Sequence, residues 1–219
     1  MSDCIINAWV GPRHYKEGQN RLLRSLEHHG YEGDLMHWSN EWPSDDFDRS
    51  CPYNIKAAAL KEAMKEHDRI LWLDCSFWAL KHPSPLFDRI SDRGYFVSMS
   101  GYNAAQVCSD ASLEYFGITR DEAEKIPDTA TGCFGLDLNH PMGWAIAEGF
   151  IDAALDGVFA GSREHGGQSQ DPRFLFHRQD QSVATLIMGK LGLPLDLPNT
   201  FTATYRKGLP ETVVFTYRG

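Results

Sequence analysis

The sequence predicts an α/β domain in which helices flank a mostly parallel central sheet. Three observations lead to this fold class. Short apolar runs alternate with amphipathic segments along the 219 residues, a pattern typical of βα units. Residues 69–74 hold a continuous apolar run closed by the carboxylate of Asp74, as in a central strand buried on both faces. The hydrophobic fraction of 42% is enough for the core of one large domain.

The first half of the chain is expected to hold three strands and two helices. Gly11 and Pro12 end the first strand, and Gly30 ends a helix that carries leucines at helical spacing. Pro52 suits the first turn of an Ala-rich helix, where a missing N–H group costs nothing. The expected strands are 4–10, 34–39 and 69–74, and the expected helices are 19–29 and 52–67.

The second half is expected to be less regular. Thr119 and Glu122 have the spacing of a capping box, which predicts a short helix within residues 103–128. Residues 157–173 are polar and Gly-rich, and we expect a mobile loop there. The longer expected elements are helices 83–90, 140–156 and 179–191 and strands 95–100, 131–138, 201–205 and 212–217.

Composition narrows the classes of partner. The formal net charge of −9 disfavours a nucleic-acid partner, because phosphate contacts need clustered Lys and Arg. A local basic patch keeps that partner open, and its candidate residues are Arg163, His165, Arg173, His177 and Arg178. No stretch is long and apolar enough to span a bilayer, and residues 1–11 lack the features of a secretory signal. We therefore expect a cytoplasmic protein without a membrane partner.

The five cysteines favour reduced thiols. Their number is odd, and no pair has the CxxC spacing of a zinc or redox site. Three of them fall in or beside expected buried strands. A cytosolic protein with reduced core thiols fits this usage better than a disulfide framework.

Asp74 is the first candidate for chemistry. In open α/β sheets, ligands bind beyond the carboxyl ends of the strands, which is where Asp74 lies. A carboxylate there needs a metal, a hydroxyl or a cation as partner. It would hold a ribose hydroxyl or a metal-bound diphosphate, or, as a structural alternative, cap the next turn.

Asp180 is the second candidate, at the start of the last long helix. Free amides and the helix dipole stabilise an anion at that position. Asp180 would act as a base towards an acceptor hydroxyl or order a bound sugar. A simple N-cap is the structural alternative.

Glycines and basic residues complete the candidate set. Gly132 and Gly135 fall in one expected strand, where they indicate close approach of a ligand or another backbone, or a bulge. A diphosphate needs positive partners, for which Lys56, Arg13 and Arg178 are candidates, with solvated surface charges as the alternative. No dinucleotide fingerprint, P-loop, GxSxG elbow or HExxH motif is present.

Taken together, these motifs resemble the GT-A nucleotide-sugar glycosyltransferases over roughly residues 4–193. The matching segments, in family order, are 54–59 at the start of a helix, 70–76 with the strand ending in Asp74, 132–136 with its two glycines, and 178–182 around Asp180. The resemblance implies a single GT-A-like, Rossmann-type domain over residues 1–219. It implies a first strand at the nucleobase, an Asp-x-Asp motif at the ribose and diphosphate, and an acidic residue of a late helix at the reacting sugar.

One departure from the family concerns the metal. The Asp-x-Asp motif stands here as Asp74-Cys75-Ser76, and a serine hydroxyl is a poor replacement for a metal-binding carboxylate. Either Asp74 and another residue, with His177 as the candidate, hold Mn²⁺ or Mg²⁺, or basic residues alone face the phosphates. The sequence leaves both alternatives open.

The resulting hypothesis is a hexosyl- or pentosyltransferase that uses a nucleoside diphosphate sugar, with a UDP-sugar favoured, and a hydroxyl acceptor. Asp180 and Asp74 are its predicted catalytic residues. The predicted substrate-binding residues are Arg13, Tyr15, Lys56, Asp74, Ser76, Gly132, Gly135, Arg178 and Gln181. The alternatives are a nucleotidyltransferase and a non-catalytic nucleotide-sugar or glycan binder; a modified DNA base is a further acceptor.

Overall fold

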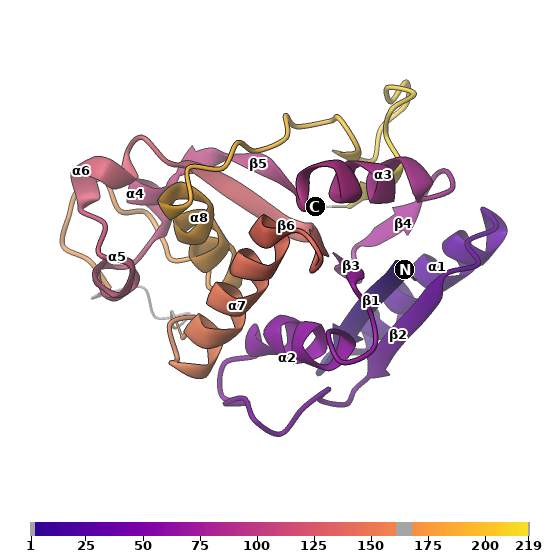
Figure 1. Ribbon diagram of the computed structural model, residues 1–219, viewed down its shortest axis with the longest axis horizontal. Helices are drawn as coiled ribbons and strands as arrows, with labels where there is room; N and C mark the ends of the chain where they lie inside the picture. The colour runs from indigo at the N-terminus through magenta and orange to yellow at the C-terminus, as the bar shows by residue number, and fades with distance from the viewer. Residues whose placement is uncertain (1–2, 161–167, 219) are drawn as a thin grey trace.

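A five-stranded sheet forms the centre of the protein (Figure 1). The computed structural model describes residues 3–160 and 168–218. The strand order is β2-β1-β3-β6-β5. The strands are β1 Asp3–Trp9, β2 Asp34–Ser39, β3 Arg69–Leu73, β5 Tyr95–Asn103 and β6 Pro127–Asp137.

Strand direction agrees with the predicted fold class. β1 pairs in parallel with both β2 and β3. β6 is antiparallel to β3 and to β5, so β5 points the same way as the first three strands. Four of the five strands therefore share one direction, and helices cover the sheet, as expected for an α/β protein.

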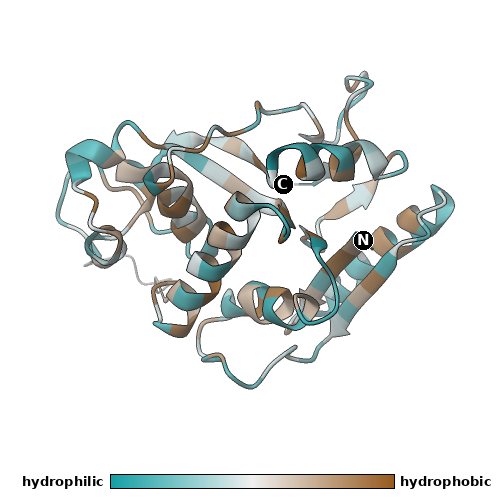
Figure 2. Cartoon of the chain, in the orientation of Figure 1, coloured by the Kyte–Doolittle hydropathy of each residue, from teal (hydrophilic) through white to brown (hydrophobic). Residues whose placement is uncertain are grey.

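The central strands are buried on both faces, as their apolar sequences predict. Ile6 and Trp72 point to one side of the sheet, and Ile5 and Leu71 point to the other. This alternation follows from the two-residue period of a strand. Figure 2 shows that hydrophobic residues gather in these strands, while much of the connecting chain is hydrophilic.

Helices pack on both sides of the sheet. The larger core lies on the side of α2, α4, α5, α6, α7 and α8, and the smaller core lies on the side of α1 and α3. The helices are α1 Arg13–His28, α2 Asn54–Ala63, α3 Ser84–Arg93, α4 Ala104–Val107, α5 Asp110–Phe116, α6 Arg120–Ala123, α7 Pro141–Leu155 and α8 Asp180–Lys190. The predicted capping box is present, with Thr119 accepting from the backbone N–H of Glu122.

A second sheet was only partly predicted. It has the order β4-β8-β7, with β4 Phe77–Ala79, β7 Thr202–Thr204 and β8 Phe215–Tyr217. The two closing strands were expected but are shorter than the predicted ranges, and β4 was missed. β4 has three residues, too few to show an alternating pattern.

Several boundaries differ from the prediction. α1 begins at Arg13 rather than residue 19, directly after Pro12 at its N-cap. α2 is shorter than predicted because turns replace the helix after Ala63. β6 begins at Pro127 rather than residue 131. The expected mobile loop 157–173 falls partly on residues 161–167, which lie outside the described residues, as do Arg163 and His165 of the candidate basic patch.

Candidate active site

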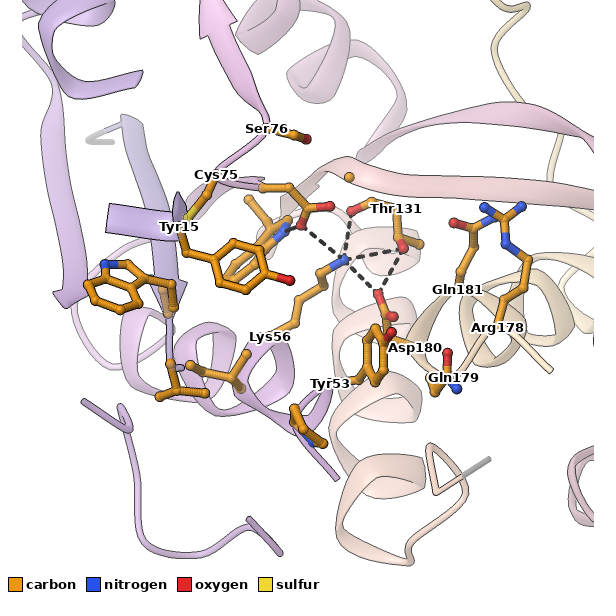
Figure 3. A pocket seen from close by; sticks show the side chains of 18 of the residues that line it. Tyr15, Tyr53, Lys56, Cys75, Ser76, Thr131, Arg178, Gln179, Asp180 and Gln181 are labelled. Atoms are coloured by element: carbon orange, nitrogen blue, oxygen red, sulfur yellow. Dashed lines mark hydrogen bonds and ion pairs between the residues drawn. The ribbon is translucent and has the colours of Figure 1, made fainter. Parts of the chain in front are cut away.

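A cavity of about 840 Å³ lies beyond the carboxyl ends of β1 and β3. Its volume falls in the range typical of small-molecule sites. Nine of the residues predicted from the sequence line it: Tyr15, Lys56, Asp74, Ser76, Gly132, His177, Arg178, Asp180 and Gln181. Figure 3 shows many of these side chains converging from segments far apart in the chain.

Lys56 lies at the centre of the cavity's polar cluster (Figure 3). Its Nζ is 2.6 Å from Asp180 Oδ2 and 3.6 Å from Asp74 Oδ1. It also donates to the carbonyl of Thr131 at 2.9 Å, while Thr131 Oγ1 donates to Asp180 Oδ2 at 2.8 Å. α2, β6 and α8 thus meet at one ammonium group.

The surroundings of Lys56 keep it charged. Its side chain is 8% exposed, and that of Asp180 is 7% exposed. Burial alone would lower the pKa of Lys56, but the carboxylates of Asp180 and Asp74 outweigh burial and raise that pKa above its ordinary value. The cavity therefore contains a buried ammonium between two carboxylates.

Asp74 is the more open of the two acids, with its side chain 43% exposed. Trp72 Nε1 donates to Asp74 Oδ1 at 2.6 Å. The indole of Trp72 thereby fixes the direction of the carboxylate, and its ring also lies 5.3 Å from Lys56 Nζ. Trp72 was predicted as part of the strand but not as a site residue.

Gly132 makes room for Asp74. A Cβ at this position would lie 3.0 Å from Asp74 Oδ2 and 2.8 Å from the ring of Phe77. The Gly132 carbonyl also accepts from the backbone N–H of Asp74 at 2.8 Å. The close approach predicted for this glycine is therefore that of the Asp74 carboxylate and of Phe77.

Helix α1 supports the turn at 74–76. At Gly18, a Cβ would lie 2.2 Å from the Cys75 carbonyl, so α1 packs against bare backbone there. Arg21 Nη2 donates to the carbonyls of Cys75 and Ser76 at 3.3 and 3.0 Å. The position of Asp74 thus depends on a helix on the opposite side of the sheet from Lys56.

A strained turn positions Asp180 at the edge of the cavity. The Arg178 carbonyl accepts from the Gln181 N–H at 3.0 Å, closing a four-residue turn. Gln179, its second residue, has φ 49° and ψ −118°, values of a type II′ turn that favour glycine. Asp180 then begins α8, as predicted. Strained backbone of this kind clusters at functional sites.

Asp128 organises the adjacent wall of the cavity and was missed by sequence reasoning. It is fully buried and accepts from Arg178 Nη1 at 2.9 Å and from Gln181 Nε2 at 3.0 Å. Thr185 Oγ1 donates to it at 2.7 Å. Asp128 lies in β6, at a point expected to be irregular, so no strand pattern marked its side chain as buried.

Two predicted binding residues lie outside the cavity. Arg13 is exposed at the start of α1, where its Nε lies 3.8 Å from Glu17 Oε1. Gly135 faces α3, and a Cβ there would lie 2.3 Å from Ile90 Cδ1. At Gly135 the missing side chain therefore leaves room for the packing of α3 against the sheet.

The residues that the structure describes do not fit a metal held by protein side chains alone. Within residues 3–160 and 168–218, no group of three His, Cys, Asp or Glu side chains could hold a metal ion. Asp74 Oδ1 already accepts from Trp72, and Nδ1 of His177, the other proposed ligand, accepts from the Ser109 N–H at 3.2 Å. Mg²⁺ and Mn²⁺ prefer several oxygen ligands, and Ser76 offers only a hydroxyl.

Comparison with known proteins identifies the fold. No protein-family model matches the sequence, and no curated protein is detectably similar to it. The structure of mouse xyloside xylosyltransferase 1, apo form, aligns with 99% of this chain and 97% of its own, with TM-score 0.54 and 12% identity. The galactosyltransferase LgtC, in complex with donor and acceptor sugar analogs, aligns with 98% of this chain and 86% of its own, with TM-score 0.54 and 13% identity. This chain therefore has the GT-A fold that its motifs predicted.

Proposed function

We propose that this protein is a glycosyltransferase that moves a sugar from a nucleoside diphosphate sugar, with a UDP-sugar favoured, to a hydroxyl acceptor. The supporting observation is the Lys56–Asp74–Asp180 cluster in a cavity at the carboxyl ends of β1 and β3. The two similar structures are a xylosyltransferase and a galactosyltransferase. Hexosyl and pentosyl transfer both agree with this proposal.

The donor would enter with its base at the end of β1. Trp9 and Tyr15 line the cavity there, and the exposed ring of Tyr15 offers an aromatic face for the base. Asp74, held by Trp72, would accept a hydrogen bond from a ribose hydroxyl. Ser76 and the ammonium of Lys56 would lie near the diphosphate.

The ion pair limits what Asp180 can do. Its Oδ2 accepts from both Lys56 and Thr131. Both lone pairs of this oxygen are therefore engaged within the protein and do not face an acceptor hydroxyl. We therefore assign Asp180 to orienting Lys56 and the donor sugar, rather than to removing the acceptor proton.

Residues 1–219 would act as one catalytic domain. The larger core joins residues from β1 through α8, including Ile6, Trp72 and Val183. A core shared by distant segments supports one folding unit.

Ser76 supports a second candidate function, that of a non-catalytic binding protein. Because a serine replaces the usual second carboxylate, a non-catalytic nucleotide-sugar binder would also fit the cavity. Such a protein would bind a donor but show no turnover, including no slow hydrolysis to free sugar.

Thermal unfolding with a panel of UDP-, GDP-, CMP- and dTDP-sugars tests the proposal. A ligand that binds only the folded state stabilises it by mass action, so we expect one nucleotide to raise Tm selectively. Since no three His, Cys, Asp or Glu side chains of the described residues come together as a metal site, we expect that shift to persist in EDTA. Transfer or hydrolysis of the selected donor then separates an enzyme from a binder.

Thermal shifts measured in EDTA and in Mn²⁺ test whether donor binding requires a metal. Loss of the shift in EDTA, with recovery in Mn²⁺, would show that the donor brings a metal that Asp74 helps to hold. No shift with any donor would remove the main support for a sugar transferase and leave the fold intact.

A further inference from the structure

A second group of side chains lies next to the cavity, on the β4 side. It consists of Arg21, Trp78, Tyr205 and Arg218, here called the arginine–tryptophan cluster. The guanidinium carbons of Arg21 and Arg218 lie 4.5 and 6.0 Å from the Trp78 ring centroid. The Tyr205 ring lies 5.4 Å from the Trp78 ring. α1, β4 and the carboxyl ends of the parallel strands β7 and β8 thus meet at one indole.

The cluster is contiguous with the cavity. Ser76 lines the cavity, and its carbonyl accepts from Arg21 Nη2 at 3.0 Å. Trp78 is two residues further along the chain, in β4. Figure 3 shows Ser76 at the edge of the labelled group, where the chain leaves for β4.

Among the described residues, no acid pairs with the two arginines of this cluster. Across residues 3–160 and 168–218, neither Arg21 nor Arg218 forms a salt bridge, although the protein carries a net charge of −9. Arg21 Nε is buried and has no hydrogen-bond partner within the same residues. Burial, and then the neighbouring charge of Arg218, lower the pKa of Arg21. Two arginines placed together at a free-energy cost are typical of a site that binds an anion.

The cluster is also rigid enough to recognise a ligand. Arg21 is held by two backbone carbonyls and by the indole face, so its planar fork is fixed in direction. Tyr205 is 55% exposed and offers an open aromatic surface beside it. A fixed guanidinium with an aromatic neighbour suits a carboxylate or phosphate carried on a ring.

We propose that the arginine–tryptophan cluster binds a carboxylate or phosphate substituent of an anionic saccharide acceptor. This inference rests on the proposed function, because it places the acceptor beside the sugar that the cavity would hold. Arg218 binds the anion from solvent, Arg21 fixes its direction, and Tyr205 contacts the sugar ring.

The observations favour a saccharide over a nucleic acid. Binding along a nucleic acid requires a stripe of cations that meets successive phosphates. The described cations of the candidate basic patch are instead satisfied by acids: Arg173 pairs with Asp171, and Arg178 pairs with Asp128. Among the described residues, the guanidinium groups of Arg21 and Arg218 form one pair around a single indole, which suits one charged substituent.

NMR titration of the full chain without donor tests the proposal. The probes are glucuronic acid, glucose 6-phosphate and neutral glucose, observed at the arginine Nε–Hε signals. We expect at least one charged probe to shift the signals of Arg21 and Arg218, and glucose to leave them unchanged. Arg218→Gln should weaken that binding by about tenfold or more, because a charge-assisted contact is lost.

Arg24→Gln is the matched control, since it removes an exposed arginine of α1 outside the cluster. It should leave the affinity unchanged. The proposal is overturned if no charged probe shifts these signals, if glucose binds as well, or if Arg218→Gln binds normally. Tighter binding of a single-stranded oligonucleotide through the same arginines would overturn the saccharide assignment. Because the titration needs neither donor nor turnover, its result is separate from the donor test of the proposed function.

Discussion

The ion pair between Lys56 and Asp180 contributes to the free energy of unfolding. Asp180 is buried and finds its counter-charge in Lys56. Removing one member of a buried pair leaves the other charge uncompensated, which costs about 3–5 kcal/mol. We expect Lys56→Met to lower the free energy of unfolding by about this amount, as measured by urea denaturation.

Two further variants separate charge from packing. Lys65→Met removes an exposed ion pair with Glu62 and should cost about 1 kcal/mol or less. The double variant Lys56→Met/Asp180→Asn has no unpaired buried carboxylate. Its loss of unfolding free energy should therefore be smaller than the sum of the losses in the two single variants. If Lys56→Met and Lys65→Met lost the same unfolding free energy, the stabilising role of the buried ion pair would be wrong.

The same pair predicts a pH dependence. The pKa of Lys56 is raised in the folded state above its ordinary value of 10.5, by carboxylates that outweigh burial. A raised pKa contributes stability that is fully present below the unfolded pKa and is lost as pH rises through the folded pKa. The difference in unfolding free energy between wild type and Lys56→Met should therefore stay constant from about pH 7 to 10 and shrink at higher pH. A difference that already declines near pH 8 would show that Lys56 is neutralised by burial.

Sequence reasoning found the individual charged residues more readily than their partners. Asp74 was predicted because a carboxylate at the end of a buried strand is costly without a metal, a hydroxyl or a cation as partner. The Lys56–Asp180 bond joins residues 124 positions apart and depends on how α2 and α8 pack, which no local pattern encodes. Asp128 was missed for a similar reason: the residues that satisfy it come from β5, α8 and the segment before α8.

At the scale of elements, β6 carries two glycines with different purposes. Gly132 makes room for Asp74 and Phe77, whereas Gly135 makes room for Ile90 of α3. The sequence predicted both as ligand contacts, because a glycine in a strand signals close approach without naming the neighbour. Their surroundings become distinct only once β3 and α3 are in place.

Alanine substitutions distinguish these two purposes. Gly132→Ala would displace the Asp74 carboxylate and so weaken donor binding. Gly135→Ala would force the Ile90 side chain to move, at a cost of about 1–3 kcal/mol in stability, with donor affinity retained. Urea denaturation and donor-dependent thermal shifts measure the two effects. If Gly135→Ala weakened donor binding as much as Gly132→Ala, the separation of the two positions would be wrong.

At the scale of the molecule, the order of the motifs along the chain predicted the fold better than any single motif did. Buried strands and amphipathic helices follow from apolar periodicity, so the main sheet was largely predictable. The insertion of β6 between β3 and β5, antiparallel to both, was not, since strand order depends on long-range packing. That insertion brings Thr131 beside Lys56 and completes the site.

Asp196 attaches the C-terminal segment to α3 and β5. This carboxylate is buried and accepts from Arg89 Nη2 at 2.7 Å and from Arg93 Nη1 at 3.1 Å. Its backbone also bonds to Val97 and Met99 of β5. The segment that continues from Asp196 forms β7 and β8, which carry Tyr205 and Arg218 at their ends.

We therefore expect Asp196→Asn to loosen the small sheet before the main one. The two arginines are partly exposed, so solvent screening limits the loss to about 1–3 kcal/mol. Hydrogen exchange should become faster for amides of β7 and β8 but not for those of β1 and β3, because local opening needs less free energy than global unfolding. Asp92→Asn, an exposed neighbour 3.7 Å from Arg89, is the control. If all four strands exchanged faster together, Asp196 would support the whole fold, and the arginine–tryptophan cluster could not open independently of the cavity.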